Sequence, residues 1–401
     1  MDRTLVLNIH PTPEQASILY RTLSEHTACF NDVVYTGFTE KCSNGVALHK
    51  QTYYPLRAQY PDLPAQLVCA ARVKATETVK SALTWQKKQE QDYPKKVAKA
   101  LKKGKPIPVF KPVTCPCVKH CPIRYDVRSY WVKWESSTCS LATVAGRIAI
   151  PFTVPVYAHK YIGYKTCSAD LCYRKGKWKL HVVVSMPEPA STATQDMVGV
   201  DLGLNRPAVT SNKHFLGERR WKEQEKRLFR LRRKLQAKGT KSAKRHLKKL
   251  SGKLLRQRRD HDHVLSQRIV QNAQAGSTIV LENLTYIRER TKMRHSEGQR
   301  RLHSWSFAQL HTFLAYKAQE RGIQVVKVDP RHTSQQCSRC GHQHRSNRRS
   351  QSLFLCRACG YSLNADLNAS INIKQKYLAS LGTSLGSGPP SSGLSSQPLV
   401  G

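Results

Sequence analysis

Two Cys-x-x-Cys pairs near the carboxyl-terminal end constrain this chain more than any other feature. The pairs are Cys337/Cys340 and Cys356/Cys359, and fifteen residues separate them. Two such pairs at this spacing are typical of a structural zinc site, in which each pair supplies two thiolates from one tight turn. Four thiolate ligands leave no open coordination position for a substrate. We therefore expect one structural zinc ion, which holds the local fold together.

The second constraint is charge. The 401 residues contain 67 Lys and Arg against 26 Asp and Glu, a formal net charge of +41. Repulsion on this scale destabilises a compact chain unless a polyanion neutralises it, and nucleic acid is the natural partner. A membrane surface is the alternative, but no apolar run approaches the ~20 residues of a spanning helix. The start of the chain lacks the features of a signal peptide, and the cysteines number thirteen, an odd total. We therefore expect a cytoplasmic protein with no membrane partner.

The amino-terminal half divides into a helical and a strand-rich region. Residues 3–10 alternate as a strand, and Thr12, Pro13 and Gln15 then form a helix start with a capping box. Helical periodicity continues to about residue 90, and a basic stretch over 94–112 follows, which is either a solvated loop or a contact for nucleic acid. Residues 123–187 are rich in strand formers. We expect a small β-barrel or sheet here, closed with help from the first strand.

A cysteine cluster precedes these strands. It contains Cys115, Cys117, His120 and Cys121. A second metal site is conceivable, but Cys-x-Cys and an adjacent His-Cys are poor spacings for a tetrahedral site. Loop cysteines without a ligand are the default interpretation.

The carboxyl-terminal half contains a strongly basic helical segment. Residues 219–259 hold nineteen Lys and Arg and only Glu223 and Glu225 as acids. Leucines recur at heptad-like spacing on both sides of Gly239-Thr240, which predicts an antiparallel helical hairpin with a narrow apolar seam. A solvated hairpin normally mixes charges of both signs, so contact with phosphate is the stronger interpretation. Residues 380–401 are dominated by Ser, Gly and Pro, and we expect a disordered tail.

Three acids stand out against this basic background. Asp201 ends an apolar strand, Glu282 ends a second one, and Asp366 opens a helical stretch. The RNase H-like fold has this arrangement: two strands and a helix each carry one acid, and the three carboxylates converge on two divalent ions. Such a pair of ions stabilises the attacking and leaving oxygens of phosphodiester hydrolysis, and Mg²⁺ prefers these hard oxygen ligands. Convergence of the three acids is not visible in the sequence itself.

Three segments resemble the split RuvC motifs and the inserted zinc finger of the TnpB family of transposon-encoded proteins. They are VGVDLGL (198–204), IVLENL (279–284) and TSQQCSRCGH…CRACGYSLNADLNASINI (333–373). The resemblance implies that Asp201, Glu282 and Asp366 are catalytic and bind two Mg²⁺ ions, and that the four cysteines bind zinc. The departures from the family pattern are peripheral, namely the CPCVKHC loop and the long tail.

The resemblance also implies a multidomain α+β architecture, with a helical recognition domain, a wedge-like β-barrel and a RuvC-like nuclease domain that carries the four-cysteine zinc finger. The expected boundaries are 1–11 with 110–190 for the barrel, 12–109 for the helical domain, 195–332 and 363–379 for the nuclease domain, 219–275 for its basic helical insertion, 333–362 for the finger and 380–401 for the tail.

The function that the resemblance implies is RNA-guided cleavage of DNA. The expected partners are a guide RNA from the transposon end and double-stranded target DNA beside a short flanking motif, with one protein per RNA in a prokaryotic, nucleoid-associated setting. The basic residues Arg345, Arg348 and Arg349 between the cysteine pairs are expected to be available to nucleic acid. The alternatives are a catalytically silent RNA-guided repressor, a strand-transferring or accessory transposition protein, and a plain zinc-finger protein that binds nucleic acid.

Overall fold

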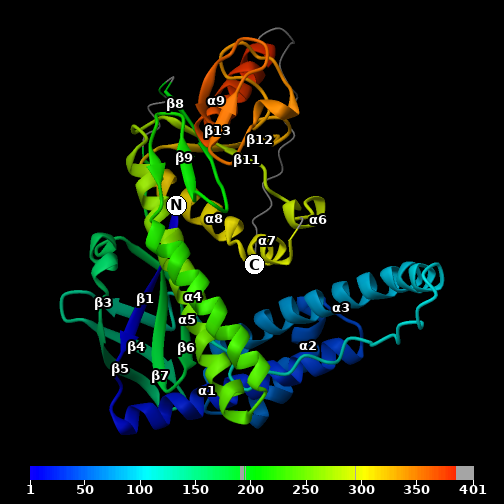
Figure 1. Cartoon of the computed structure of the whole chain (residues 1–401). Coiled ribbons are helices and arrows are strands. Elements are labelled where there is room, and N and C mark those ends of the chain that lie inside the picture. Colours follow the sequence, from blue (N-terminus) through cyan, green and yellow to red (C-terminus); the bar gives the residue numbers. More distant parts are fainter. Residues whose placement is uncertain (190–193, 195, 294, 385–401) are drawn as a thin grey trace. The chain divides into compact units, whose positions relative to one another are not determined.

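The computed structural model describes residues 1–189, 194, 196–293 and 295–384 (Figure 1). They belong to two compact units, Met1–Pro187 and Glu188–Gly401. Of the expected tail, residues 385–401 lie outside the described residues, whereas residues 380–384 complete a helix, so the prediction of disorder is wrong for these five. Within the described ranges, no helix combines the length and the apolar character needed to cross a membrane.

The first unit contains a seven-stranded sheet and three long helices. Its elements are β1 (Asp2–Ile9), α1 (Pro13–Thr39), α2 (Gly45–Gln59), α3 (Ala65–Leu101), β2 (Ile123–Tyr125), β3 (Tyr130–Lys133), β4 (Thr138–Thr143), β5 (Gly146–Thr153), the 3₁₀ turn η1 (Val156–Tyr161), β6 (Lys165–Arg174) and β7 (Lys177–Ser185). The strand order is β2-β6-β7-β1-β5-β4-β3. The expected first strand therefore lies in the middle of the sheet, between β5 and β7.

The start of α1 confirms the predicted capping box. The Thr12 side chain accepts a hydrogen bond from the backbone N–H of Gln15, and the Gln15 side chain accepts one from the backbone N–H of Thr12. Pro13 occupies the first helical position, where its missing N–H costs nothing. Such a cap stabilises a helix by about 1 kcal/mol, and here it fixes the turn that joins β1 to α1.

The helices and the sheet of the first unit share one hydrophobic core. Leu19 and Leu23 of α1 are buried together with Leu5 and Leu7 of β1 and other strand residues. The helical region and the strand-rich region that the sequence predicts therefore pack against each other through this core. The basic stretch over 94–112 differs from its prediction, because α3 continues through Pro94 to Leu101 before the loop begins.

The second unit contains a five-stranded sheet of mixed direction. Its elements are β8 (Met197–Asp201), β9 (Ala208–Thr210), β10 (Phe215–Leu216), α4 (Arg219–Lys238), α5 (Lys241–Gln271), β11 (Thr278–Glu282), α6 (Ile287–Arg290), α7 (Ser296–Ser304), α8 (Phe307–Gln319), β12 (Gln324–Val328), the 3₁₀ turn η2 (Arg345–Asn347), β13 (Leu353–Leu355), β14 (Ser362–Asn364) and α9 (Ala365–Ser384). The strand order is β10-β9-β8-β11-β12. The pairs β10/β9 and β9/β8 are antiparallel, whereas β8/β11 and β11/β12 are parallel.

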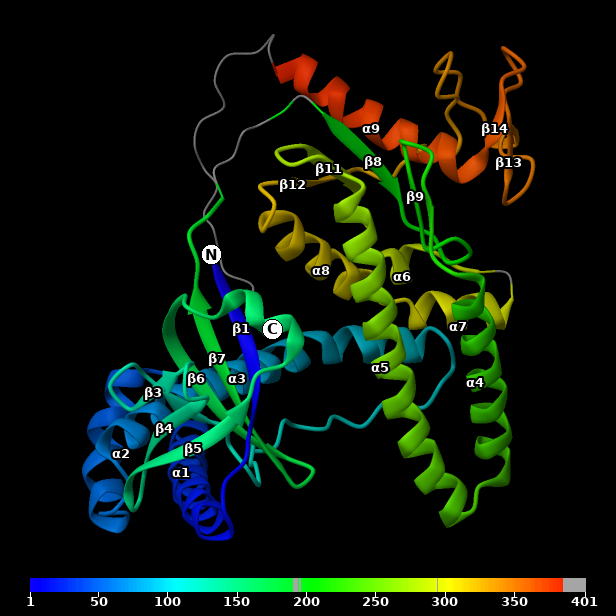
Figure 2. The ribbon, with the colours of Figure 1, turned by 90° about the vertical axis from the view of Figure 1, so that its left-hand side faces the viewer.

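Helices cover both faces of this sheet (Figure 2). The residues that share the core on one face are Val198, Val200, Ile279 and Leu281 from the strands, Leu265, Ile269 and Val270 from α5, and Leu310 and Leu314 from α8. The intervening residue Val280 packs with Val328 and Ile373 of α9 on the opposite face. The side chains thus alternate between the two faces, as a strand requires, and both faces are buried, as is typical of parallel strands.

The predicted helical hairpin is confirmed. Gly239 ends α4 in the left-handed conformation with φ of 63°, and the Thr240 side chain caps α5. The apolar seam is formed by Leu228, Leu231, Leu235, Leu250 and Leu254. The last turns of α5 do not belong to this seam, because their apolar residues enter the sheet core described above. Residues 219–275 are therefore only partly an insertion.

Candidate functional site

Asp201 and Glu282 lie side by side at the carboxyl edge of the sheet. Strands β8 and β11 are parallel, and Val200 pairs with Leu281 in their register. The next residue of each strand is an acid, so the register brings the two carboxylates to the same edge. Each acid ends its strand, which is where the chain leaves the buried sheet and a polar side chain can face a ligand.

Asp366 reaches the same region from α9. This helix begins at Ala365, carries Asp366 in its first turn, and packs across β8. The close packing depends on Gly199, which lies in the middle of β8. A Cβ atom at this position would lie 2.8 Å from the backbone nitrogen of Lys374 and still closer to the carbonyl oxygen of Ser370. Only glycine therefore allows α9 to approach the strand that ends in Asp201.

Electrostatics shows that the three acids form one cluster. Burial, then the negative charges of Glu282 and Asp366, raise the pKa of Asp201 to about 8. Burial also raises the pKa of Glu282, although the Thr333 hydroxyl works against this by donating a hydrogen bond of 2.5 Å to Glu282 Oε1. Like charges that must share a buried site favour protonation, and a bound cation would relieve that cost.

An arginine from the segment between the cysteine pairs contacts this cluster. Arg348 Nη2 donates a hydrogen bond of 2.9 Å to Asp366 Oδ1, and both side chains are largely buried. The positive charge of Arg348 also lowers the pKa of Asp201. The expectation that Arg348 is free for nucleic acid is therefore wrong, while Arg345 and Arg349 are exposed.

The donors of the acid cluster fit hard divalent cations. Three carboxylates from three elements offer oxygen ligands, and Mg²⁺ completes its octahedron with water or substrate oxygens. Arg348 lowers the pKa of both Asp201 and Glu282, and Lys376 lowers that of Glu282, but burial outweighs these effects and the pKa of each acid stays raised. Among the described residues, only the four cysteines bring their ligand atoms within 4.8 Å of one another, so cation binding by the three acids is a proposal.

The four predicted cysteines converge at a second centre. Their Sγ atoms lie within 4.8 Å of one another, with 3.8 Å between Cys337 and Cys359 and 3.6 Å between Cys340 and Cys356. Tetrahedral ligation with metal–sulfur bonds of about 2.3 Å requires sulfur atoms about 3.8 Å apart. Backbone N–H groups of Cys359 and Ala358 lower the pKa of the Cys356 thiol, whereas hydrogen bonds with the other thiols raise that of Cys340, so the two thiols share a proton. The set therefore fits a closed tetrahedral metal site.

The other cysteine cluster does not form such a centre. Cys115, Cys117 and Cys121 are not among the described side chains that gather as possible metal ligands. Cys121 is buried, and burial raises the pKa of its thiol to about 11. Both observations favour the interpretation of loop cysteines without a ligand.

Hydrogen bonds tie the cysteine loop (residues 337–359) to α9. Asn368 accepts from the backbone N–H of Ser338 at 3.0 Å and donates to the carbonyl of Gln336 at 2.8 Å. Asn372, one turn further along α9, donates to the same carbonyl at 2.7 Å. The first cysteine turn is thus fixed to the helix that carries Asp366.

Two residues of the site were not assigned a role from the sequence, and a third was assigned to the wrong contact. Thr333 lies four residues before the cysteine loop, Gly199 lies within the first acidic motif, and Arg348 is the one with the wrong contact. A glycine inside an apolar strand is a signal of close backbone approach, so Gly199 could have been found. Neither Thr333 nor Arg348 could have been, because their acidic partners lie 51 and 18 residues away along the chain.

Comparison with known proteins identifies related chains. The model OrfB_IS605, described as "Probable transposase", matches residues 181–288, and the model "Cas12f1-like, TNB domain" matches residues 307–373. Together these segments contain all three acids and all four cysteines.

Curated relatives match between about a third and a half of the chain. "CRISPR-associated endodeoxyribonuclease Cas12f1" of Sulfoacidibacillus thermotolerans is 32% identical over 50% of this chain and 50% of its own length. "Putative RNA-guided DNA endonuclease InsQ" of Escherichia coli strain K12 is 32% identical over 49% of this chain and 53% of its own. "TnpB-like protein MJ0751" of Methanocaldococcus jannaschii is 33% identical over 32% of this chain and 46% of its own length. The chain thus spans about half the length of the curated relatives it matches. The two family models and these relatives agree with one another, and their similarity to this chain supports an assignment to the TnpB family.

Proposed function

We propose that this chain is a transposon-encoded, RNA-guided DNA endonuclease that hydrolyses phosphodiester bonds at Asp201, Glu282 and Asp366. The observation that carries the proposal is the acid cluster itself. Acids from β8, β11 and α9 interact: burial first, and then the charges of Glu282 and Asp366, raise the pKa of Asp201 to about 8, and a bound cation would relieve this cost. The names of the relatives, which include RNA-guided and CRISPR-associated endonucleases, support the same function.

The sheet supports an RNase H-like, RuvC-type assignment for this unit. Its order is β10-β9-β8-β11-β12, with antiparallel pairs on one side of β8 and parallel pairs on the other. The first acid stands on the central strand, the second on its parallel neighbour, and the third on a helix that covers the sheet. We propose residues 195–332 and 363–379 as this domain, residues 1–11 and 110–190 as a wedge-like domain, and residues 12–109 as a recognition domain.

In this mechanism the three carboxylates would hold two Mg²⁺ ions, which would activate water and neutralise the leaving oxygen. The chain's own residues position this chemistry. Thr333 holds Glu282 Oε1 through its hydroxyl, and Arg348 holds Asp366 Oδ1. The guanidinium also lowers the pKa of Asp201, which favours the ionised carboxylate that a cation would need.

The four cysteines are proposed to hold one Zn²⁺, which takes no part in hydrolysis. Their distances fit a tetrahedron of sulfur ligands, and Asn368 connects their loop to α9. The zinc would therefore act on catalysis only by fixing Arg348 and the start of α9.

A guide RNA and double-stranded DNA are the proposed partners, with one protein per RNA. The net charge of +41 suits a protein that neutralises an RNA and a DNA strand together. Base pairing would read the target, while the protein reads a short flanking motif and the shape of the heteroduplex. The cell compartment that follows is the prokaryotic cytoplasm, in association with the nucleoid.

The test is cleavage of a target plasmid by purified protein with the RNA that co-purifies with it. We expect the wild-type protein to cut the plasmid in the presence of Mg²⁺ and the Asp201→Ala variant not to cut it. The matched control is Asp196→Ala, an exposed acid five residues earlier, which should cut normally. Undiminished cutting by Asp201→Ala would refute the catalytic assignment, and target binding without any cutting by the wild type would support a silent repressor instead.

A second candidate is strand transfer during transposition, which the family description "Probable transposase" favours. Such a protein would join DNA ends, whereas a nuclease only releases them. Sequencing the products of the same reaction for joined ends separates the two.

A further inference from the structure

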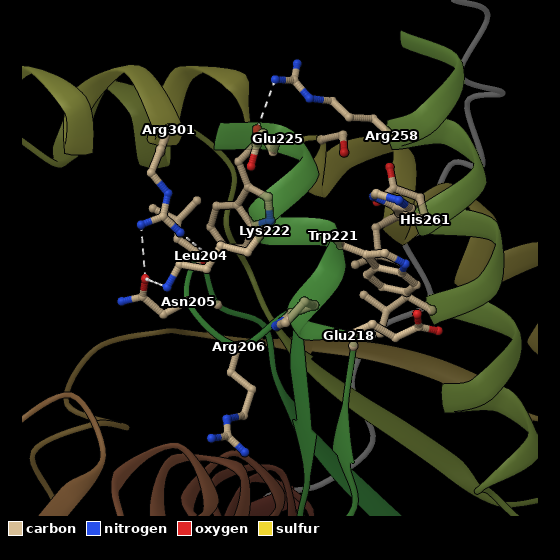
Figure 3. A pocket seen from close by; sticks show the side chains of 18 of the residues that line it. Leu204, Asn205, Arg206, Glu218, Trp221, Lys222, Glu225, Arg258, His261 and Arg301 are labelled. Carbon is tan, nitrogen blue, oxygen red and sulfur yellow. Dashed lines mark hydrogen bonds and ion pairs between the residues drawn. The ribbon is translucent and has the colours of Figure 1, made fainter. Parts of the chain in front are cut away.

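A cavity of about 500 Å³ lies beside the loop that follows Asp201 (Figure 3). It is lined by the loop Gly203–Pro207, by α4 and α5, and by the segment Arg301–Ser306. All of these belong to the second unit. A volume of this size accommodates a small organic molecule, and nothing in the acid cluster or the cysteine loop lines it.

One wall of the cavity is flat and aromatic. The rings of Trp221 and His261 are stacked, with centroids 4.4 Å apart and an angle of 14° between their planes. An indole is a surface on which a nucleobase stacks, and such stacking contributes about 1–3 kcal/mol per base. The wall therefore suits an aromatic ligand.

A buried acceptor without a partner lies next to this wall. Asp262 lines the cavity with only 8% of its surface exposed, and among the described residues its Oδ2 has no hydrogen-bond partner. Burial raises the pKa of Asp262 to about 6, against the opposing effects of Ser306 and Arg258. A buried oxygen of this kind normally has a donor, and the N–H groups on the edge of a base are suitable donors.

Two cations meet on the opposite side without an acid to balance them. Arg301 Nη1 and Lys222 Nζ both donate to Asn205 Oδ1, at 3.0 Å and 3.4 Å (Figure 3). Neither forms an ion pair with a described carboxylate, whereas Arg258 in the same cavity pairs with Glu225 at 3.2 Å. The pKa of Lys222 is lowered, mainly by partial burial and then by the charges of Arg301 and Lys226. An anion between Lys222 and Arg301 would relieve this repulsion.

We propose that this cavity binds one nucleotide of the DNA strand that is cut, with its phosphate between Lys222 and Arg301 and its base against Trp221. The inference rests on the proposed function and deepens it. The cut strand is preferred over RNA because the lining loop starts two residues after Asp201. We therefore place the cavity on the path of a strand that has a phosphate at the acid cluster.

The test measures binding separately from cleavage. The complex of the full chain with its co-purified RNA, carrying Asp201→Asn to stop hydrolysis, is titrated with a single-stranded DNA oligonucleotide. Lys222→Glu is compared with Lys226→Glu, which makes the same charge change one turn further along α4 and outside the cavity lining. We expect Lys222→Glu to weaken binding by about tenfold more than Lys226→Glu, and Arg301→Gln to weaken it as well.

A second measurement locates the base. The oligonucleotide carries photoreactive thymine analogues, and we expect the crosslink on the peptide that contains Trp221. Equal effects of Lys222→Glu and Lys226→Glu, or crosslinks only outside the cavity, would overturn the inference while leaving the nuclease intact. A crosslink from the guide RNA at Trp221 would also overturn it. Binding in the cavity by a protein that never cuts DNA would instead refute the proposed function alone.

Discussion

Arg348 Nη2 lies 2.9 Å from Asp366 Oδ1, so the segment between the cysteine pairs forms an ion pair with one of the three acids. Thr333, four residues before the first cysteine, donates a hydrogen bond to Glu282. The cysteine loop is therefore more than a stabilising insertion. Arg348 of the loop contacts Asp366, and Thr333, just before the loop, contacts Glu282.

The first prediction concerns this arginine. Arg348→Ala removes the positive charge that contacts Asp366 and lowers the pKa of Asp201. We expect cleavage to fall by about 10²–10³-fold, the range found when one oriented donor is removed from an active site. Guide RNA binding should be unchanged. The rate of plasmid cleavage at saturating RNA measures the effect.

The controls are Arg345→Ala and Arg349→Ala, which remove exposed arginines of the same segment. If either lowers cleavage as much as Arg348→Ala does, the arginine acts by general attraction of nucleic acid rather than by its contact with Asp366.

The second prediction concerns Gly199. A Cβ at this position meets backbone atoms of α9, which cannot turn aside as a side chain can. We expect Gly199→Ala to destabilise the protein by at least about 1–3 kcal/mol, as overpacking does, and to abolish cleavage by displacing Asp366. Denaturant unfolding and the cleavage assay measure the two effects.

Gly252→Ala is the matched control. Gly252 lies inside α5, where a Cβ would meet only the flexible end of Arg256 at 3.4 Å. Alanine is favoured over glycine in a helix by up to about 1 kcal/mol, so this change should stabilise the protein. A Gly199→Ala protein as stable as the wild type would show that α9 can move without cost.

Much of the site could be predicted because each part is encoded locally. The strands that end in Asp201 and Glu282, the helix that starts near Asp366 and the capping box at Thr12 all follow from residues within a few positions of one another. The cysteine spacing is local in the same sense. In each case a short sequence pattern favours one local structure, and that local structure is present.

The contacts between these elements could not be predicted. The sequence shows three basic residues at 345, 348 and 349, and nothing local separates the one that binds Asp366 from the two that remain exposed. Likewise, the end of α5 reads as a continuation of the basic hairpin, yet Ile269 and Val270 complete the sheet core. Such choices depend on which surfaces meet in space, so only the three-dimensional packing decides them.

The third prediction concerns the metal of the cysteine loop. We expect about one zinc ion per chain, and Cys337→Ser should lose it and destabilise the protein, because the energy of metal binding is part of the folding energy here. Elemental analysis and thermal unfolding measure both effects. Cys117→Ser, in the other cysteine cluster, should keep the zinc. Two zinc ions per wild-type chain, with one lost in Cys117→Ser, would instead establish the second site.

The fourth prediction concerns pH. The pKa of Asp201 is raised to about 8 in the folded protein, whereas an unfolded Asp has a pKa of about 4. The folded state therefore holds this proton more tightly, and stability falls as pH rises from about 4 to 8 in the absence of divalent ions.

Asp201→Asn removes this titration and keeps the shape of the side chain. We expect its free energy of unfolding to exceed that of the wild type by a few kcal/mol at pH 8 and by less at pH 5, since each pKa unit corresponds to about 1.4 kcal/mol. Urea unfolding of metal-free protein at the two pH values measures this difference, and Asp196→Asn serves as the control. Histidines that titrate in the same range contribute equally to both proteins and cancel. Added Mg²⁺ should restore the wild type at pH 8 and affect Asp201→Asn much less, because ligation favours the ionised carboxylate. Parallel stability curves for the two proteins would mean that Asp201 is already ionised at pH 5, and the cation-binding cluster would then lose its electrostatic basis.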